Sequence, residues 1–417
     1  MTGPRLSRRS ALGLIGAAGA AGVAGGFTAG AARGDDAPST TDLVVPFRGK
    51  HQAGITTAVQ QHLYFASFDM TSTAGREELK SLLADWTAAA ARMTRGQDVT
   101  DEGAVGGGPY KPPDDTGEAL DLQANALTIT FGFGPTLFED ADGRDRFGIA
   151  DRRPKELVEL PSFAFDLLED RFSGGDLCIQ ACANDPQVAV HAIRNLSRIA
   201  FGRAQVRWTQ LGYGRTSTTS KAQATPRNLF GFKDGTANIF GSDGSDLATS
   251  VWADDSDQPW LDGGTFLVAR KIQMLIESWD RVRLEEQEAI IGRDKGEGAP
   301  LSGGTEFTEP KFDVFSTKAG GPAIPMDSHV RLAHPDHNGG ARMLRRGYNF
   351  VEGNNDLGQL NAGLFFLAFV RSPQQFIDVQ RSLAKDTLNE YIRHIGSAIF
   401  AVPGGIRAGD SVGSGLF

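Results

Sequence analysis

The chain has 417 residues, of which 40% are hydrophobic and 22% charged, and it contains 26 phenylalanines. This composition supplies cores for two or three domain-sized units and excludes a disordered or fibrous protein. The net charge of −9, with no long basic run after residue 10, argues against nucleic-acid binding. Two cysteines are too few for a disulfide scaffold or a four-cysteine metal site.

The first 31 residues are typical of an export signal. The pair Arg8-Arg9 precedes an uncharged stretch rich in glycine and alanine, and Ala29-Gly30-Ala31 fits a signal-peptidase site. A disordered basic arm is the alternative. The stretch is too rich in glycine for a comfortable membrane span. We therefore expect a twin-arginine signal peptide over 1–31 and a linker over 32–55. The twin-arginine translocon would be a partner during export of the folded chain to a periplasm or the exterior.

The first half of the mature chain has the element order of a ferredoxin-like unit. Leu79, Leu82, Leu83 and Trp86 share one face of a predicted helix, and Asp185 is the expected N-cap of a second. The predicted strands are 63–68, 126–133, 176–184 and 204–213, and the helices are 75–95 and 186–201. The order β-α-β-β-α-β is the split pattern of a ferredoxin-like fold.

The same order recurs in the second half. The predicted strands are 265–272, 342–350, 364–371 and 397–402, and the helices are 273–291 and 373–383. The sequence thus predicts an α+β protein with two ferredoxin-like units packed sheet to sheet, as in a dimeric α+β barrel. We expect units at 56–214 and 263–405, a connecting segment at 215–262 and a tail at 406–417. A ligand would lie between the sheets and the insertions 214–262 and 293–341.

Three of the seven histidines, His329, His334 and His337, lie in one short segment. Neutral imidazole is the commonest protein donor to iron, so the segment is a candidate metal or haem ligand. A surface-loop histidine is the alternative for each, and a non-haem metal site formed by all three is a further hypothesis.

Two other motifs carry chemistry. In the first, Gly231 and Gly235 bracket Asp234 and allow a flat ligand to approach the backbone closely, although turns often look like this. In the second, basic residues lie on a predicted strand over 342–348, where a buried cation needs an anionic partner or a reactive ligand.

In chain order, the segments GFKDGTANI, DSHVRLAHP, RMLRRGYNF and LNEYIRHIGSAIFAVP closely resemble the dye-decolourising peroxidases. They are most similar to the twin-arginine-exported subgroup also described as deferrochelatase/peroxidase. The resemblance runs from about Gly54 to Gly405. It implies one haem b per chain, between or beside the two units, and hydrogen peroxide as the oxidant.

The resemblance also implies roles for individual residues. His329 matches the axial iron ligand, Asp234 the distal acid–base residue and Arg345 the distal arginine, whereas Glu390 matches the carboxylate bonded to the axial histidine. Further haem contacts fall on Gly235, Thr236, Ala237, His334, Pro335 and Asp336. Phe365 and Leu367 are expected to wall the distal pocket.

Two functions follow from the resemblance. The first is a haem peroxidase that oxidises bulky phenolic or dye-like donors in one-electron steps through a ferryl intermediate. The second is a haem-handling deferrochelatase that releases iron from haem for an uptake system. In both, the mature chain has no nucleic-acid partner and no stable membrane span.

Overall fold

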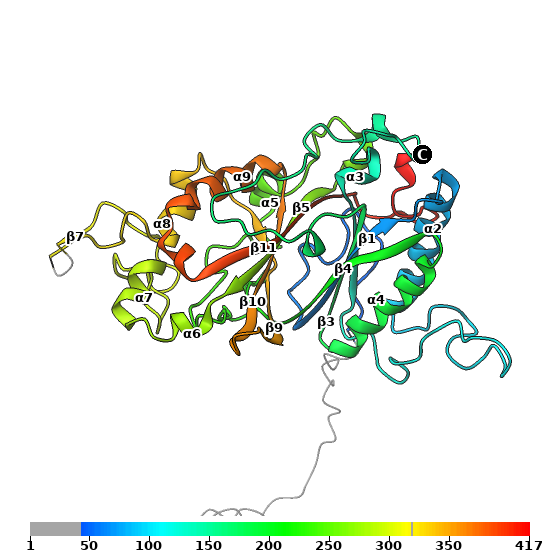
Figure 1. Ribbon diagram of the computed structural model, residues 1–417, viewed down its shortest axis with the longest axis horizontal. Coiled ribbons are helices and arrows are strands. Elements are labelled where there is room, and N and C mark those ends of the chain that lie inside the picture. The colour runs from blue at the N-terminus through cyan, green and yellow to red at the C-terminus, as the bar shows by residue number, and fades with distance from the viewer. Residues whose placement is uncertain (1–42, 318–319) are drawn as a thin grey trace, which may run out of the picture. The chain divides into compact units, whose positions relative to one another are not determined.

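The computed structural model describes residues 43–317 and 320–417, so the predicted signal peptide and its cleavage site lie outside the described residues. Two four-stranded antiparallel sheets form the centre of the described part (Figure 1). The first, in the order β2-β3-β1-β4, contains β1 (His62–Met70), β2 (Thr128–Phe133), β3 (Leu177–Ala183) and β4 (Ala204–Arg215). The second, in the order β11-β5-β10-β9, contains β5 (Thr265–Met274), β9 (Tyr348–Asn354), β10 (Leu360–Val370) and β11 (Ile392–Val402). Both orders are those of the predicted ferredoxin-like units.

The two sheets join along both edges into a closed ring. β11 meets β2 at Ala401 and Phe133, and β4 meets β9 where Tyr213 pairs with Asn349. The buried interior cluster draws side chains from both sheets and includes Phe65, Trp208, Phe365 and Phe400. The Phe65 ring centroid lies 5.1 Å from that of Trp208 and 5.3 Å from that of Phe365. Apolar side chains therefore fill the space between the sheets, which the sequence predicts as part of a ligand site.

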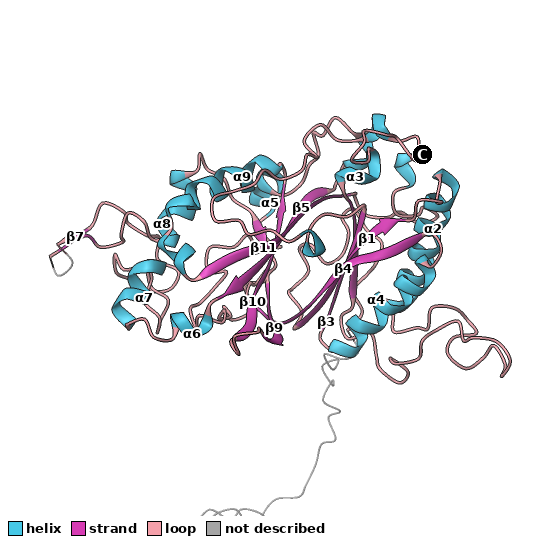
Figure 2. Ribbon diagram, viewed as in Figure 1, coloured by secondary structure: helices cyan, strands magenta, loops and turns pink. Residues whose placement is uncertain are grey.

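Helices cover the outer faces of the sheets (Figure 2). On the first sheet lie α2 (Arg76–Met93) and α4 (Pro186–Ala200). Asp185 caps α4 as predicted, because its side chain accepts hydrogen bonds from the first-turn backbone N–H groups. With the second unit lie α6 (Ile276–Trp279), α7 (Leu284–Ile291), α8 (His329–Ala333) and α9 (Pro373–Ser382). Shorter elements are α3 (Pro135–Phe138), α5 (Gly244–Ser250), β8 (Leu344–Arg345) and the pair β6 (Phe315–Ser316) and β7 (Gly321–Pro322).

The structure differs from the sequence prediction in several segments, and β11 starts five residues earlier than predicted. β5 continues to Met274, and α6 and α7 replace the single predicted helix over 273–291. The predicted strand over 342–350 is interrupted at Arg346 and Gly347. Residues 43–55 and 406–417 pack against the fold, because Phe47, Ile55, Val412 and Leu416 are buried.

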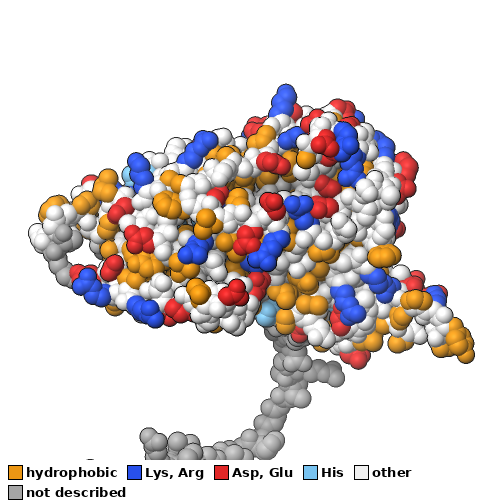
Figure 3. Space-filling view, in the orientation of Figure 1, with side chains coloured by type: hydrophobic (Ala, Val, Ile, Leu, Met, Phe, Trp, Pro, Cys, Tyr) orange, Lys and Arg blue, Asp and Glu red, His pale blue; other side chains and the backbone are white. Residues whose placement is uncertain are grey.

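The sequence predicts neither a nucleic-acid-binding surface nor a membrane span, and two observations on the described residues concern these predictions. On the face shown in Figure 3, cationic and anionic side chains are interspersed, without a continuous basic surface. Among the helices of the described ranges, none is long and apolar enough to cross a membrane.

Candidate haem site

Asp234 lies on a tight loop that closes on itself. A bridge joins Arg227 to Lys233, the Asp234 backbone N–H donates to the Pro226 carbonyl, and Gly235 turns the chain with a φ of +86°. A Cβ atom on Gly235 would lie 3.0 Å from the Ser217 Cα, so this position requires glycine on both grounds. The loop therefore fixes the direction of the Asp234 carboxylate.

Arg345 lies on β8 and forms an ion pair with Asp234. Its Nη1 is 3.0 Å from Asp234 Oδ1, and both side chains are only partly exposed. The other carboxylate oxygen, Oδ2, has only a long contact of 3.4 Å with Asn228 Nδ2. At this distance a hydrogen bond is weak, so Oδ2 remains available to a ligand.

Asn238, four residues after Asp234, connects the loop to β8. Its Oδ1 accepts the Arg345 backbone N–H at 2.7 Å, and its Nδ2 donates to the Arg345 carbonyl at 2.8 Å and to the Thr218 carbonyl at 2.9 Å. The buried amide thus satisfies both backbone groups of Arg345, as a neighbouring strand would. The motif GFKDGTANI contains Asn238 but predicts no role for it.

The other two arginines of the motif have different partners. Arg346 is fully buried and donates to the Thr57 carbonyl and to Gln60, both in the first half of the chain. Arg342 pairs with Asp246 at 2.5 Å. Of the three arginines, only Arg345 pairs with Asp234.

The register of β8 corrects the expected wall of the pocket. Arg345 pairs with Ala368, and cross-strand partners project to the same face of a sheet. Phe365 and Leu367 alternate with Ala368 and belong to the buried cluster between the sheets. Leu364 and Phe366 share the face of Arg345 instead.

His329 begins α8 and is held by a buried carboxylate. Its Nδ1 is 2.6 Å from Asp386 Oδ2, whereas Asp386 Oδ1 accepts the Leu388 backbone N–H as a helix cap. The prediction that Glu390 makes this contact is wrong, because Glu390 ends the same short helical turn and is exposed. Asp386, which caps the start of the turn, is buried, whereas Glu390 at its end faces solvent.

Charges of both pairs affect the protonation of His329. Burial lowers the pKa of His329, but the Asp386 carboxylate outweighs it, so that the pKa lies above the ordinary value. Asp234 also raises this pKa and Arg345 lowers it, so both act on the imidazole.

The donor set fits an axial haem ligand. Asp386 fixes the His329 tautomer with the proton on Nδ1, which leaves the Nε2 lone pair for a metal. The imidazole is 36% exposed although its carboxylate partner is 2% exposed, so the free edge of the ring is accessible. Histidine is a common axial ligand of haem iron, and a carboxylate on its other ring nitrogen fixes its orientation, so the two residues fit this role.

The remaining predicted haem contacts have protein partners of their own. Thr236 donates from its hydroxyl to Glu306 at 3.3 Å, and Ala237 follows in the same loop. His334 Nε2 lies 2.9 Å from Glu309, and its Nδ1 lies 3.5 Å from Asp336. Pro335 starts a short 3-10 helix over Pro335–His337.

A bare-metal site finds no support in the described residues, since no group of three or more histidine, cysteine, aspartate or glutamate side chains is arranged to hold an ion. His334 and His337 instead pack against the Phe312 ring, with centroids at 4.9 and 5.0 Å. The hypothesis of a three-histidine metal site therefore fails within this part of the chain.

Family models match almost the whole described chain. Residues 52–214 match the model described as Dyp-type peroxidase, N-terminal, and residues 225–407 match Dyp-type peroxidase, C-terminal. The chain belongs to the Dyp-type peroxidase family. This membership makes it a peroxidase with haem as cofactor, in agreement with the donor set at His329.

Relatives and solved structures agree with the assignment. The chain is 38% identical over 380 residues to a dye-decolorizing peroxidase of Thermobifida fusca, covering 88% of this chain and 83% of the relative. It is 36% identical over 394 residues to the deferrochelatase of Escherichia coli K12, covering 93% and 90%. A DyP-type peroxidase from Streptomyces coelicolor superposes with a TM-score of 0.81 at 37% identity, covering 90% of this peroxidase and 97% of that chain. Ferric DtpA from Streptomyces lividans gives 0.81 at 36% identity, covering 90% and 98%.

Proposed function

We propose that this peroxidase uses hydrogen peroxide to oxidise bulky phenolic or dye-like donors one electron at a time, with Asp234 and Arg345 as its distal residues and His329 as its axial ligand. The observation that carries the proposal is the geometry of two charged pairs, Asp234 with Arg345 and His329 with Asp386, each of which leaves one atom available to a ligand: Asp234 Oδ2 and the second ring nitrogen of His329.

Each side chain has a distinct task in this proposal. Haem, when bound, supplies the iron that activates peroxide and stores the oxidising equivalents. Asp234 Oδ2 accepts a proton from one peroxide oxygen and returns it to the other, so that water can leave. Arg345 stays protonated at any working pH and stabilises the negative charge that develops on the departing oxygen. Asp386 accepts a hydrogen bond from the Nδ1–H of His329 and makes the imidazole a stronger donor. The predicted haem contacts would border the haem: these are Gly235, Thr236, Ala237, His334, Pro335 and Asp336.

The test compares two arginines of the same segment. Arg345→Leu should slow the change in the haem absorption band on mixing with peroxide by more than about tenfold, equivalent to about 1.4 kcal/mol of barrier. Arg342→Leu is the matched control, because Arg342 pairs with Asp246 and not with Asp234, and it should stay within about twofold of the parent. A parental rate in Arg345→Leu, or equal slowing in both variants, would refute the assignment of the distal arginine.

A second function, iron release from haem, is kept because relatives named deferrochelatase share 36% identity over 93% of the chain. In that role the protein would serve an iron-uptake system. Incubation of the haem-loaded protein with and without peroxide separates the two. Free protoporphyrin with retained ring structure indicates iron release, whereas oxidised donor with intact haem indicates a peroxidase.

We further propose that the chain is exported in folded form by the twin-arginine route and acts in a periplasm or outside the cell. The support is the Arg8-Arg9 motif with its uncharged stretch and small-residue cleavage site. Substitution of both arginines by lysine should retain the precursor inside the cell, as followed by fractionation and immunoblotting. Unchanged export of this variant would exclude the route.

A further inference from the structure

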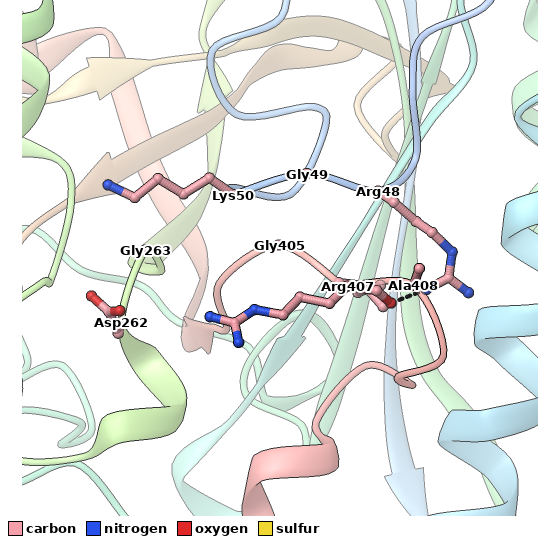
Figure 4. A pocket seen from close by; sticks show the side chains of 9 residues that line it. Arg48, Gly49, Lys50, Asp262, Gly263, Gly405, Arg407 and Ala408 are labelled. Atoms are coloured by element: carbon pink, nitrogen blue, oxygen red, sulfur yellow. Dashed lines mark hydrogen bonds between the residues drawn. The ribbon is translucent and has the colours of Figure 1, made fainter.

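A pocket of about 530 Å³ lies between three loops, and its lining shares no residue with the site of Asp234 and His329. Its lining comes from residues 48–50, 262–263 and 405–408 (Figure 4). These segments meet where β5 begins and β11 ends, since Val402 pairs with Thr265. The volume lies within the range of pockets that hold small organic ligands.

The loops that form the pocket are fixed to each other through their backbones. The Gly405 N–H donates to the Lys50 carbonyl at 2.8 Å, and His51 Nδ1 lies 2.7 Å from the Gly263 carbonyl. A Cβ atom on Gly405 would lie 2.2 Å from the Gly49 carbonyl oxygen, so only glycine permits this approach. The pocket is therefore a defined feature of the fold.

Its charge is opposite to that of the protein. Arg48, Lys50 and Arg407 line it with a single carboxylate, Asp262, although the whole chain has a net charge of −9. In Figure 4 the Lys50 and Arg407 side chains extend toward the side of Asp262, and Arg48 extends the other way. The cations are thus spread across the pocket.

These cations also lack anionic partners in the described structure. Arg48 donates only to the backbone carbonyls of Arg407 and Asp410. The side chains of Lys50 and Arg407 have no ion pair or hydrogen bond within the described ranges. Elsewhere arginines of this chain pair closely with carboxylates, for example Arg203 with Asp85 at 2.8 Å. The donors of Lys50 and Arg407 are therefore available to a ligand.

We propose that this pocket binds a small organic anion through a sulfonate or carboxylate group. A guanidinium presents paired N–H donors that match the oxygens of such groups, and the ammonium adds a point charge. Ile406, Ala408 and the aliphatic stems of the cations offer apolar contact to the rest of the molecule. The site does not depend on the proposed peroxidase chemistry, because its lining includes none of the residues of the haem site.

The test measures binding to the haem-loaded protein without peroxide. Titration calorimetry at about 0.03 M salt compares naphthalene-2-sulfonate with its neutral analogue naphthalene-2-sulfonamide. We expect one site that binds the sulfonate at least about fivefold more tightly, and a preference that falls at about 0.5 M salt. The haem absorption band should not change on binding, since the pocket lies outside the haem site.

Variants localise the binding. Arg407→Gln and Lys50→Gln should each weaken sulfonate binding about fivefold. The matched control is Arg95→Gln, which removes an exposed arginine without a side-chain partner among the described residues and far from the pocket in sequence. Equal affinity for sulfonate and sulfonamide would overturn the proposal. So would equal weakening by Arg407→Gln and Arg95→Gln, or a shift of the haem band that neither pocket variant affects.

Discussion

Asn238→Ala should uncouple the distal loop from Arg345. The substitution removes three hydrogen bonds of a side chain that is 3% exposed and leaves the Arg345 N–H and two carbonyls without this partner. At about 1 kcal/mol for each net hydrogen bond, the free energy of unfolding should fall by about 3 kcal/mol. A displacement of Arg345 by about 1 Å would slow its action on peroxide by about tenfold to a hundredfold. Urea unfolding measures the first effect, and stopped-flow absorption on mixing with peroxide measures the second.

Asn195→Ala provides the matched control. Asn195 is 1% exposed and also makes three hydrogen bonds, with the Thr116 N–H, the Thr116 hydroxyl and the His191 carbonyl. It joins α4 to the loop over 96–120 and has no contact with the haem site. Both variants should lose similar stability, but only Asn238→Ala should react slowly with peroxide. If the two react at the same rate, the connection from Asn238 to Arg345 has no part in positioning.

Three further predictions test individual residues. His329→Ala should lose most of its haem, as measured by the ratio of haem to protein absorbance; full haem content would transfer the axial role to another histidine. Asp386→Asn should shift the reduction potential of the haem iron upward, because a neutral amide makes the imidazole a weaker donor, whereas Glu390→Gln should leave the potential unchanged. Burial raises the pKa of Asp115, but hydrogen bonds from a histidine ring and two backbone amides outweigh it and hold that pKa at about 2. Because the folded pKa is below the ordinary value, the ionised group stabilises the fold by about 2 kcal/mol above about pH 5, and this contribution is lost as the pH falls from about 4 to about 2. Urea unfolding of Asp115→Asn should therefore show a large deficit at about pH 6 that mostly disappears near pH 2; an equal deficit at both values would contradict this reasoning.

Local patterns in the sequence are sufficient for most of the fold. The apolar spacing of Leu79, Leu82, Leu83 and Trp86 predicts α2, and all four are buried. Asp185 followed by proline predicts the start of α4. Such features depend on neighbours within one turn, so no tertiary information is needed.

The prediction fails where distant partners decide the structure. β5 extends to Met274 because Met274 pairs with Ile392 on one side and Gln273 with Gly363 on the other. The sequence motif predicts Glu390 as the partner of His329, but the carboxylate four residues earlier takes this place, because Asp386 caps the start of the turn and is buried whereas Glu390 ends it and is exposed. The role of Asn238 is not predicted because its partner, the Arg345 backbone, lies 107 residues away in the sequence. An asparagine shortly after an Asp-Gly turn is nevertheless a recognisable signal of a side-chain contact with the backbone.

Both halves of the chain contribute side chains to the buried interior of the ring, so a fragment of one half would lack part of that core. All the residues assigned to the haem site lie between 234 and 386, so the second half looks self-sufficient on a linear map. Yet Phe65 and Trp208 cover Phe365 and Phe400, and Arg346, next to Arg345, is anchored on Gln60. A fragment that contained only the second half would expose a sheet face evolved for burial and would leave a guanidinium without its partner. The smallest unit that can support this chemistry is therefore the complete ring, and the first half contributes to the haem site without supplying any of its reactive groups.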